Sequence, residues 1–134
     1  MSEHVAVVRE PYLGLIAMGL KTVESRLSVS RCAPFGRVSA GDVVWFKRPG
    51  GGCEVRARVG RVRSWEGLTP GGVAEIRREF GERVAAPASY WREKRGSRFA
   101  TLVWLEGVEL RSDGPTVGPL HGRAWVCLEE AARG

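Results

Sequence analysis

The 134-residue chain has no run of about 18 apolar residues, so its sequence predicts no helix that crosses a membrane. Its first residues also lack the basic and then apolar pattern of a secretory signal peptide. Histidine and cysteine are scarce, and no C-x-x-C pair occurs among His4, His121, Cys32, Cys53 and Cys127. We therefore expect a soluble, cytoplasmic protein with free thiols, no metal site and no cofactor.

Internal repeats and a disordered composition are absent as well. Hydrophobic residues make up 43% of the chain, which is an ordinary share for a globular protein. A chain of this length buries a core without the help of a metal or a disulfide. We therefore predict a single domain over residues 1–134.

Acidic residues are the scarcer charged class, with 15 Asp and Glu against 21 Lys and Arg, a formal net charge of +6. Such an excess favours polyanionic partners such as nucleic acid or nucleotide phosphates. Most of the cations are arginines, which bind phosphate in a forked geometry and stack on bases. An arginine-rich genome is a second explanation of the Arg-to-Lys ratio, but it does not explain the net excess.

Hydrophobic patterns and turn residues predict the element order β-α-β-β-β-α-α-β-β. One helix begins with Thr69 as its N-cap and Pro70 at its first position, and a second spans about residues 87–95. A long strand over residues 98–110 is apolar on both faces, which is typical of a strand inside a sheet. The last strand is expected at about residues 121–130. The fold class is α+β, with strands that curl into a small mixed barrel with flanking helices.

From Tyr12 the sequence predicts a short buried helix, closed by Gly19 as its C-terminal cap, with apolar positions at Leu13, Leu15, Ile16 and Leu20. A strand follows, on which Glu24 and Arg26 share one face because successive side chains point to opposite sides. Lys21 stands in the turn between the two elements and is free to reach the same place.

Arginines recur along the predicted strand over residues 54–65. Arg56 and Arg58 share one face, whereas Arg61 and Arg63 have the opposite parity. A β-bulge at Gly60 would return all four to the same face. This row is either a track for an anionic ligand or a solvated outer face whose arginines pair with nearby carboxylates.

The segment REPYLGLIAMGLKTVESRL, residues 9–27, resembles the opening of the ASCH domain, the activating signal cointegrator homology module of the PUA-like superfamily. The shared pattern is an aromatic residue after proline, an apolar helix and then G-x-K-x-x-E-x-R. The matching positions are Pro11, Tyr12, Gly19, Lys21, Glu24 and Arg26. The family-like core covers about residues 5–110, and it implies a PUA-like β-barrel with a cleft beside the first helix.

The resemblance implies binding of RNA or a nucleotide in that cleft. Lys21 and Arg26 would donate hydrogen bonds to a phosphate or a base carbonyl. Glu24 would either hold one of these cations or accept from a base amino group. Tyr12 or Trp91 would stack on an unpaired base, or else pack in the core.

Some relatives in this family hydrolyse acetylated cytidine with a threonine of a Lys-Thr-x-Thr sequence. Here that sequence reads Lys21-Thr22-Val23-Glu24, so a glutamate replaces the second threonine. If the chain is an amidohydrolase, Lys21, Thr22 and Glu24 are its catalytic candidates, with Lys21 activating a shifted nucleophile. Because of the replacement we favour a binding protein over an enzyme. A protein-interaction module is a third possibility, and no membrane partner is expected.

Overall fold

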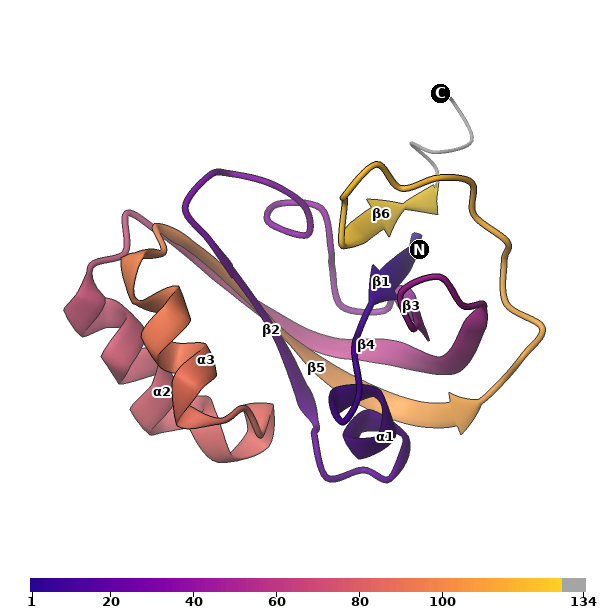
Figure 1. Cartoon of the computed structure of the whole chain (residues 1–134), viewed down its shortest axis with the longest axis horizontal. Helices are drawn as coiled ribbons and strands as arrows, with labels where there is room; N and C mark the ends of the chain where they lie inside the picture. Colours follow the sequence, from indigo (N-terminus) through magenta and orange to yellow (C-terminus); the bar gives the residue numbers. More distant parts are fainter. Residues whose placement is uncertain (129–134) are drawn as a thin grey trace.

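The computed structural model describes residues 1–128 (Figure 1). The predicted order of strands and helices is confirmed, with one added 3-10 turn after the last helix. The elements are β1 (Glu3–Val7), α1 (Tyr12–Ala17), β2 (Val23–Ser28), β3 (Val43–Lys47), β4 (Cys53–Glu66), α2 (Pro70–Val84), α3 (Ala88–Glu93), η1 (Lys94–Gly96), β5 (Phe99–Leu110) and β6 (Trp125–Cys127). Positions 129 and 130 of the predicted last strand lie outside the described residues. No helix in the described part is both long and apolar enough to span a bilayer.

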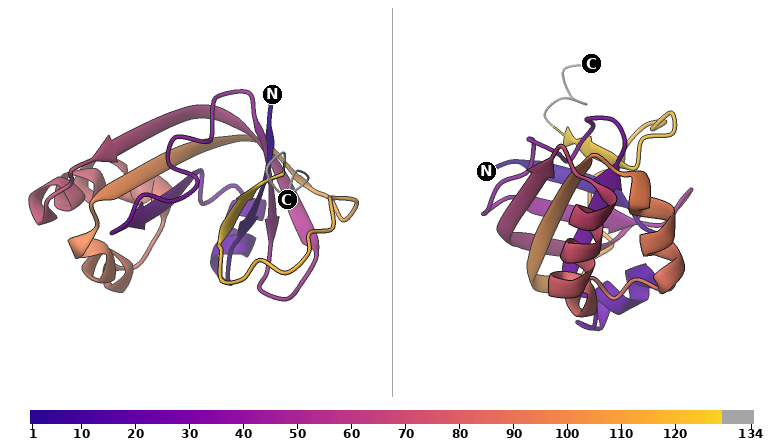
Figure 2. Two further views of the ribbon diagram at one scale, coloured as in Figure 1. Left: turned by 90° about the horizontal axis from the view of Figure 1, so that it is seen from above. Right: turned by 90° about the vertical axis from the view of Figure 1, so that its left-hand side faces the viewer.

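All the strands belong to one six-stranded sheet in the order β2-β5-β4-β3-β1-β6. The β1–β3 pair is parallel and every other pair is antiparallel, so the sheet is mixed. Figure 2 shows β4 and β5 curving from the helical end of the molecule to the end where the sheet curls over. The predicted α+β fold with a small mixed barrel is confirmed as a half-barrel, whose outer strands are β2 and β6.

The alternation of side chains on β2 and β5 produces two separate cores. Val23 and Leu27 of β2 face the helices, where they pack with the apolar side of α2 and with Trp91. The other face of the sheet encloses the barrel interior, which α1 covers with Leu13 and Ile16. Even-numbered positions on β2 therefore point away from the helical core.

Two local predictions about helices have different outcomes. Thr69 is the N-cap of α2, since its hydroxyl accepts a hydrogen bond from the Gly72 N–H, and Pro70 occupies the first turn as expected. The predicted burial of Leu20 is wrong, because α1 ends at Ala17 and the Leu20 side chain is 62% exposed. Gly19 ends this segment with a φ of +77°, a conformation that glycine adopts without strain.

The predicted bulge in β4 is confirmed. Val59 pairs with Leu105 and Arg61 with Trp104, so Gly60 is the extra residue. Arg58 lies opposite Glu106 and Arg61 lies opposite Trp104. Glu106 and Trp104 are two positions apart on β5 and therefore face the same side of the sheet, and so do the two arginines paired with them. The bulge therefore keeps the β4 arginines on one side, as predicted.

Candidate functional site along the free edge of β2

A cavity of about 620 Å³ runs along the edge of β2 that has no neighbouring strand among residues 1–128. It is the opening of the half-barrel, bounded by the segment after β1, the loop at residues 32–35, α3 with η1, the start of β5 and the segment before β6. Its size is typical of a small-molecule site, for which about 300–1,000 Å³ is usual.

Lys21, Glu24 and Arg26 converge at the wall of this cavity. The Lys21 Nζ lies 3.5 Å from Glu24 Oε1, and Arg26 Nη2 lies 3.1 Å from Glu24 Oε2. Lys21 also donates to the Val84 carbonyl at the end of α2, and the Ser25 N–H donates to Glu24 Oε1. Both carboxylate oxygens of Glu24 are therefore occupied by partners within the protein.

Arg26 connects the two sides of the opening. Its Nη2 donates to the Val7 carbonyl at 3.0 Å and its Nη1 to the Ala124 carbonyl at 3.3 Å. The guanidinium also lies 5.4 Å from the centre of the Trp125 ring. One side chain of β2 thus contacts the end of β1 and the residue before β6. It connects the two edges of the sheet, which no backbone pairing joins within the described part of the chain.

Burial and charge act in opposite directions on the two buried ionisable groups. Burial would raise the pKa of Glu24, but the charges of Arg26 and Lys21, with hydrogen bonds from Arg26 and the Ser25 N–H, hold it below its ordinary value. Burial lowers the pKa of Lys21, although the carboxylate of Glu24 acts in the opposite direction. Glu24 is therefore ionised at neutral pH, and it stabilises both cations beside it.

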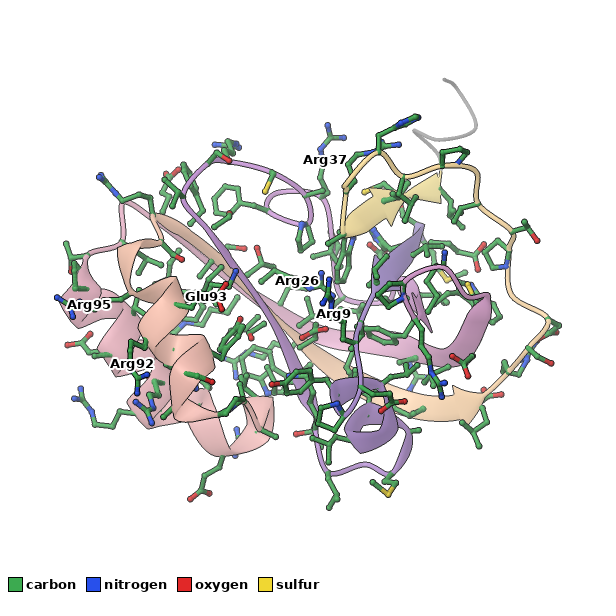
Figure 3. The ribbon with its side chains drawn as sticks, in the orientation of Figure 1. Arg9, Arg26, Arg37, Arg92, Glu93 and Arg95 are labelled. Carbon is green, nitrogen blue, oxygen red and sulfur yellow. The ribbon has the colours of Figure 1, made fainter. Side chains whose placement is uncertain are left out.

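Three further cations line the cavity, and the sequence did not single them out. They are Arg9, Lys94 and Arg123. With Lys21 and Arg26 they make five cationic side chains in the lining, whereas Glu24 is the one carboxylate that residues 1–128 contribute to it. Figure 3 shows Arg9 and Arg26 lying together between β2 and the segment after β1. Arg9 stands at the start of the ASCH-like stretch, but the positions of Lys94 and Arg123 depend on contacts between distant segments.

Aromatic side chains supply much of the remaining wall. Tyr12 lines the cavity with its ring 5.8 Å from the Lys21 Nζ. Tyr90 of α3 lies 2.8 Å from the Ser25 hydroxyl, and burial is the main cause that raises its pKa to about 12, so it stays a neutral phenol. Trp91 does not line the cavity, since its side chain is 4% exposed in the helical core.

Thr101 is an unusual polar residue in the cavity lining. It pairs with Arg26 in the register of β2 and β5 and therefore faces the same side of the sheet. Its Oγ1 is buried, and within residues 1–128 it is the one buried side-chain nitrogen or oxygen without a hydrogen-bond partner. A hydroxyl can both donate and accept, so the fold leaves one unused polar group in this wall.

The arginine row of β4 lies elsewhere. Arg56 and Arg58 pair with Glu109 and Glu106 of β5, at 3.8 and 3.0 Å. Arg61 lies over the Trp104 ring, and Arg63 pairs with a glutamate of α2. None of the four lines the cavity, so the structure separates them from Lys21, Glu24 and Arg26.

The nucleophile candidate Thr22 and the two histidines are also outside the cavity. Thr22 is exposed and is not part of the lining, and the same holds for His121. His4 is fully buried, where its Nε2 lies 2.9 Å from Asp42 Oδ2 and its Nδ1 accepts from the Trp125 indole at 3.1 Å. These contacts connect β1 to the start of β3 and to β6, which is a structural role.

The fold was compared with known proteins. No family model matches the chain, and no curated protein sequence matches it significantly. The ASCH protein from Zymomonas mobilis has a similar structure, with a TM-score of 0.65 and 17% identity over 98% of this chain and 92% of that one.

Two further solved structures extend the comparison. A substitution variant of the same protein gives a TM-score of 0.59 at 19% identity, over 79% of this chain and 70% of that one. Hypothetical protein PH0355 gives 0.56 at 19% identity, over 79% of this chain and 98% of that one. Likeness at such identities concerns the fold, and at that level the predicted resemblance is confirmed: this chain has an ASCH-like fold.

Proposed function

We propose that this protein binds RNA or a nucleotide, and that an unpaired nucleotide occupies the cavity along β2. The observation that carries this proposal is the charge of the lining, in which five cationic side chains surround one carboxylate. Such an imbalance in a partly enclosed site favours an anionic ligand, because low-dielectric walls strengthen each charge interaction. A neutral nucleoside would leave this excess uncompensated.

Glu24 acts as the residue that positions the cations. Both of its oxygens already accept hydrogen bonds from the protein, from the Ser25 N–H and from Arg26 Nη2, and these contacts fix the carboxylate beside the cations. Arg26 has five N–H donors and uses three of them in the contacts to Val7, Ala124 and Glu24. Its remaining donors, and those of the exposed Arg9 and Arg123, are the groups that we assign to the phosphate.

The aromatic wall suits the base of the same ligand. Tyr12, Phe35, Tyr90, Phe99 and Trp125 all line the cavity. Stacking of an unpaired base on an aromatic side chain contributes about 1–3 kcal/mol and tolerates any base. The site therefore combines charge for the phosphate with apolar surface for the base, without a pattern that selects one sequence.

The position of Thr22 argues against the amidohydrolase alternative. The exposed Thr22 hydroxyl is not part of the cavity lining, and Glu24 takes the place of the second threonine. The third possibility is a protein partner, and nuclease treatment distinguishes it from RNA binding. If the protein binds RNA, a complex recovered from cells should lose its partner when the RNA is digested, whereas a direct protein partner would remain bound.

The proposal is tested by titrating the protein with a nucleoside, its 5′-monophosphate and single-stranded RNA. The rim variant Arg9→Ala/Arg123→Ala should weaken binding of the phosphorylated ligands at least about tenfold, since one hydrogen bond to a charged group contributes about 1.5–3 kcal/mol. The control Arg58→Ala/Arg61→Ala removes the same charge from the opposite side of β4 and should leave binding of the monophosphate nearly unchanged. Equal losses in both variants, or no binding of any ligand, would contradict the proposal.

A further inference from the structure

A second hollow lies on the other side of α3. It is a groove of about 280 Å³ between α2 and α3, with Trp91 among its lining residues. Arg77 of α2, Arg92 of α3 and Arg95 of η1 also line it, and no carboxylate from residues 1–128 does. Arg92 and Arg95 lie at the outer side of the helices in Figure 3, whereas Glu93 lies nearer to β2.

These three arginines differ from the surface arginines that pair with carboxylates. All three are exposed, and none forms an ion pair with a carboxylate of the described residues, whereas Arg78 and Arg63 pair with the α2 glutamates Glu75 and Glu79. Three unneutralised guanidinium groups around one groove repel each other unless an anion lies between them. The groove therefore has the charge and the hydrogen-bond donors of an anion site.

The short helix α3 separates this groove from the cavity. Tyr90 and Lys94 stand four positions apart, on the side of the helix that faces the cavity. Trp91 and Arg95 have the same spacing, and together with Arg92 they face the groove. A helix is about 10–12 Å across, and a single strand at about 3.4 Å or more per phosphate crosses that width within three or four nucleotides.

We infer that the groove binds backbone phosphates of a single-stranded polynucleotide whose adjoining nucleotide occupies the cavity. This inference rests on the proposed function and narrows it, because the preferred ligand becomes a nucleic-acid chain and not a free nucleotide. Lys94 provides continuity, since it lines the cavity directly beside the arginines of the groove. We assign phosphates and not bases to the groove, because its aromatic residue, Trp91, is buried and presents little surface on which a base could stack.

The test compares a nucleoside monophosphate with a single-stranded RNA of about eight nucleotides, a length within the range that one small domain binds. The groove variant is Arg77→Ala/Arg92→Ala/Arg95→Ala. Its matched control is Arg48→Ala/Arg58→Ala/Arg111→Ala, which removes arginines that are paired with carboxylates. Both variants change the net charge by −3, from +6 to +3, so a difference between them is not an effect of overall charge.

The readout is the salt dependence of the affinity for the oligonucleotide. Each phosphate contact on a single strand contributes about 0.7 to the slope of log K against log salt, so the groove variant should lose about 2 from that slope. When salt is raised from about 50 to 200 mM, the fold-loss of affinity should therefore be about 20 times smaller for the groove variant than for the wild type. The control variant should keep most of the wild-type slope.

Failure of this inference is distinct from failure of the proposed function. If the oligonucleotide binds no more tightly than the monophosphate, or if both variants lose the same slope, the groove does not hold the chain, although the cavity proposal stands. Loss of monophosphate binding in the groove variant would likewise overturn the assignment. Binding of neither ligand overturns both proposals, and preferential binding of an acidic peptide by the groove overturns this one.

Discussion

Two arginine–glutamate pairs of nearly equal length occupy opposite kinds of surroundings in this fold. The Arg26–Glu24 pair spans 3.1 Å and the Arg58–Glu106 pair spans 3.0 Å. The Glu24 side chain is 6% exposed, whereas that of Glu106 is 53% exposed. Both pairs also belong to arginine-containing patterns that the sequence marks as ligand-binding candidates, so the contrast isolates the effect of burial.

The contrast shows that distance alone does not tell what an ion pair contributes. An exposed pair is screened by water and stabilises a fold by about 0–1 kcal/mol. A buried group of charges contributes little net stability as a set, but removal of one member leaves the others without compensation. The Lys21–Glu24–Arg26 cluster is of the second kind. Its two cations stay at the cavity wall because each of them pairs with the buried carboxylate of Glu24.

The largest expected effect is that of Glu24→Ala. This variant leaves Lys21 and Arg26 close to each other with no carboxylate between them, and the free energy of unfolding should fall by about 3–5 kcal/mol. Glu106→Ala should lower it by no more than about 1 kcal/mol. Urea denaturation of the two variants beside the wild type measures both values, and equal losses would show that burial does not distinguish the pairs.

The second effect sharpens the comparison through pH. The pKa of Glu24 is lower in the folded state than in the unfolded chain, so the unfolded state binds more protons between the two values and stability rises with pH there. The stabilisation is present above the unfolded pKa of about 4.3 and is lost as the pH falls through the folded pKa.

Glu24→Gln removes this titration with little change in shape. Urea unfolding at neutral pH and at about pH 3 should therefore show a smaller acid-induced loss of stability in the variant than in the wild type. The pKa of Asp113 is also lowered, mainly by its hydrogen bond from Arg111, but the Asp113 side chain is 63% exposed. Asp113→Asn should accordingly have the smaller effect, and the reverse order would contradict the assignment of the acid sensitivity to Glu24.

Much of the fold could be read from local sequence patterns. The Thr69–Pro70 start of α2 and the bulge at Gly60 follow from residue types whose backbone preferences are strong. The convergence of Lys21, Glu24 and Arg26 also has a local cause, since one turn and one strand position all three. Such features need only a few neighbouring residues to determine them.

The rest of the site depends on contacts that no local pattern contains. Lys94 and Arg123 reach the cavity because α3 and the segment before β6 close around the edge of β2. The placement of Trp91, a stacking candidate from the sequence, and of its neighbour Tyr90 is of the same kind, because a six-residue helix is too short for its periodicity to reveal which side faces a core. Tertiary packing decides that Tyr90 faces the cavity and Trp91 the helical core.

The smallest effect concerns the bulge that aligns the exposed arginines. A Cβ added at Gly60 would overlap the carboxylate end of the Glu106 side chain. That side chain is flexible and exposed, so Gly60→Ala should displace it, break its ion pair with Arg58 and lower the free energy of unfolding by about 1 kcal/mol or less.

A double-mutant cycle separates the two parts of this effect. In a Glu106→Ala background the overlap and the ion pair are both absent, so adding Gly60→Ala should cost less than it does in the wild type. Equal costs in the two backgrounds would place the strain in the β4 backbone instead. The bulge itself, and not the exposed Arg58–Glu106 pair beside it, would then be the feature that fixes the register of β4 against β5.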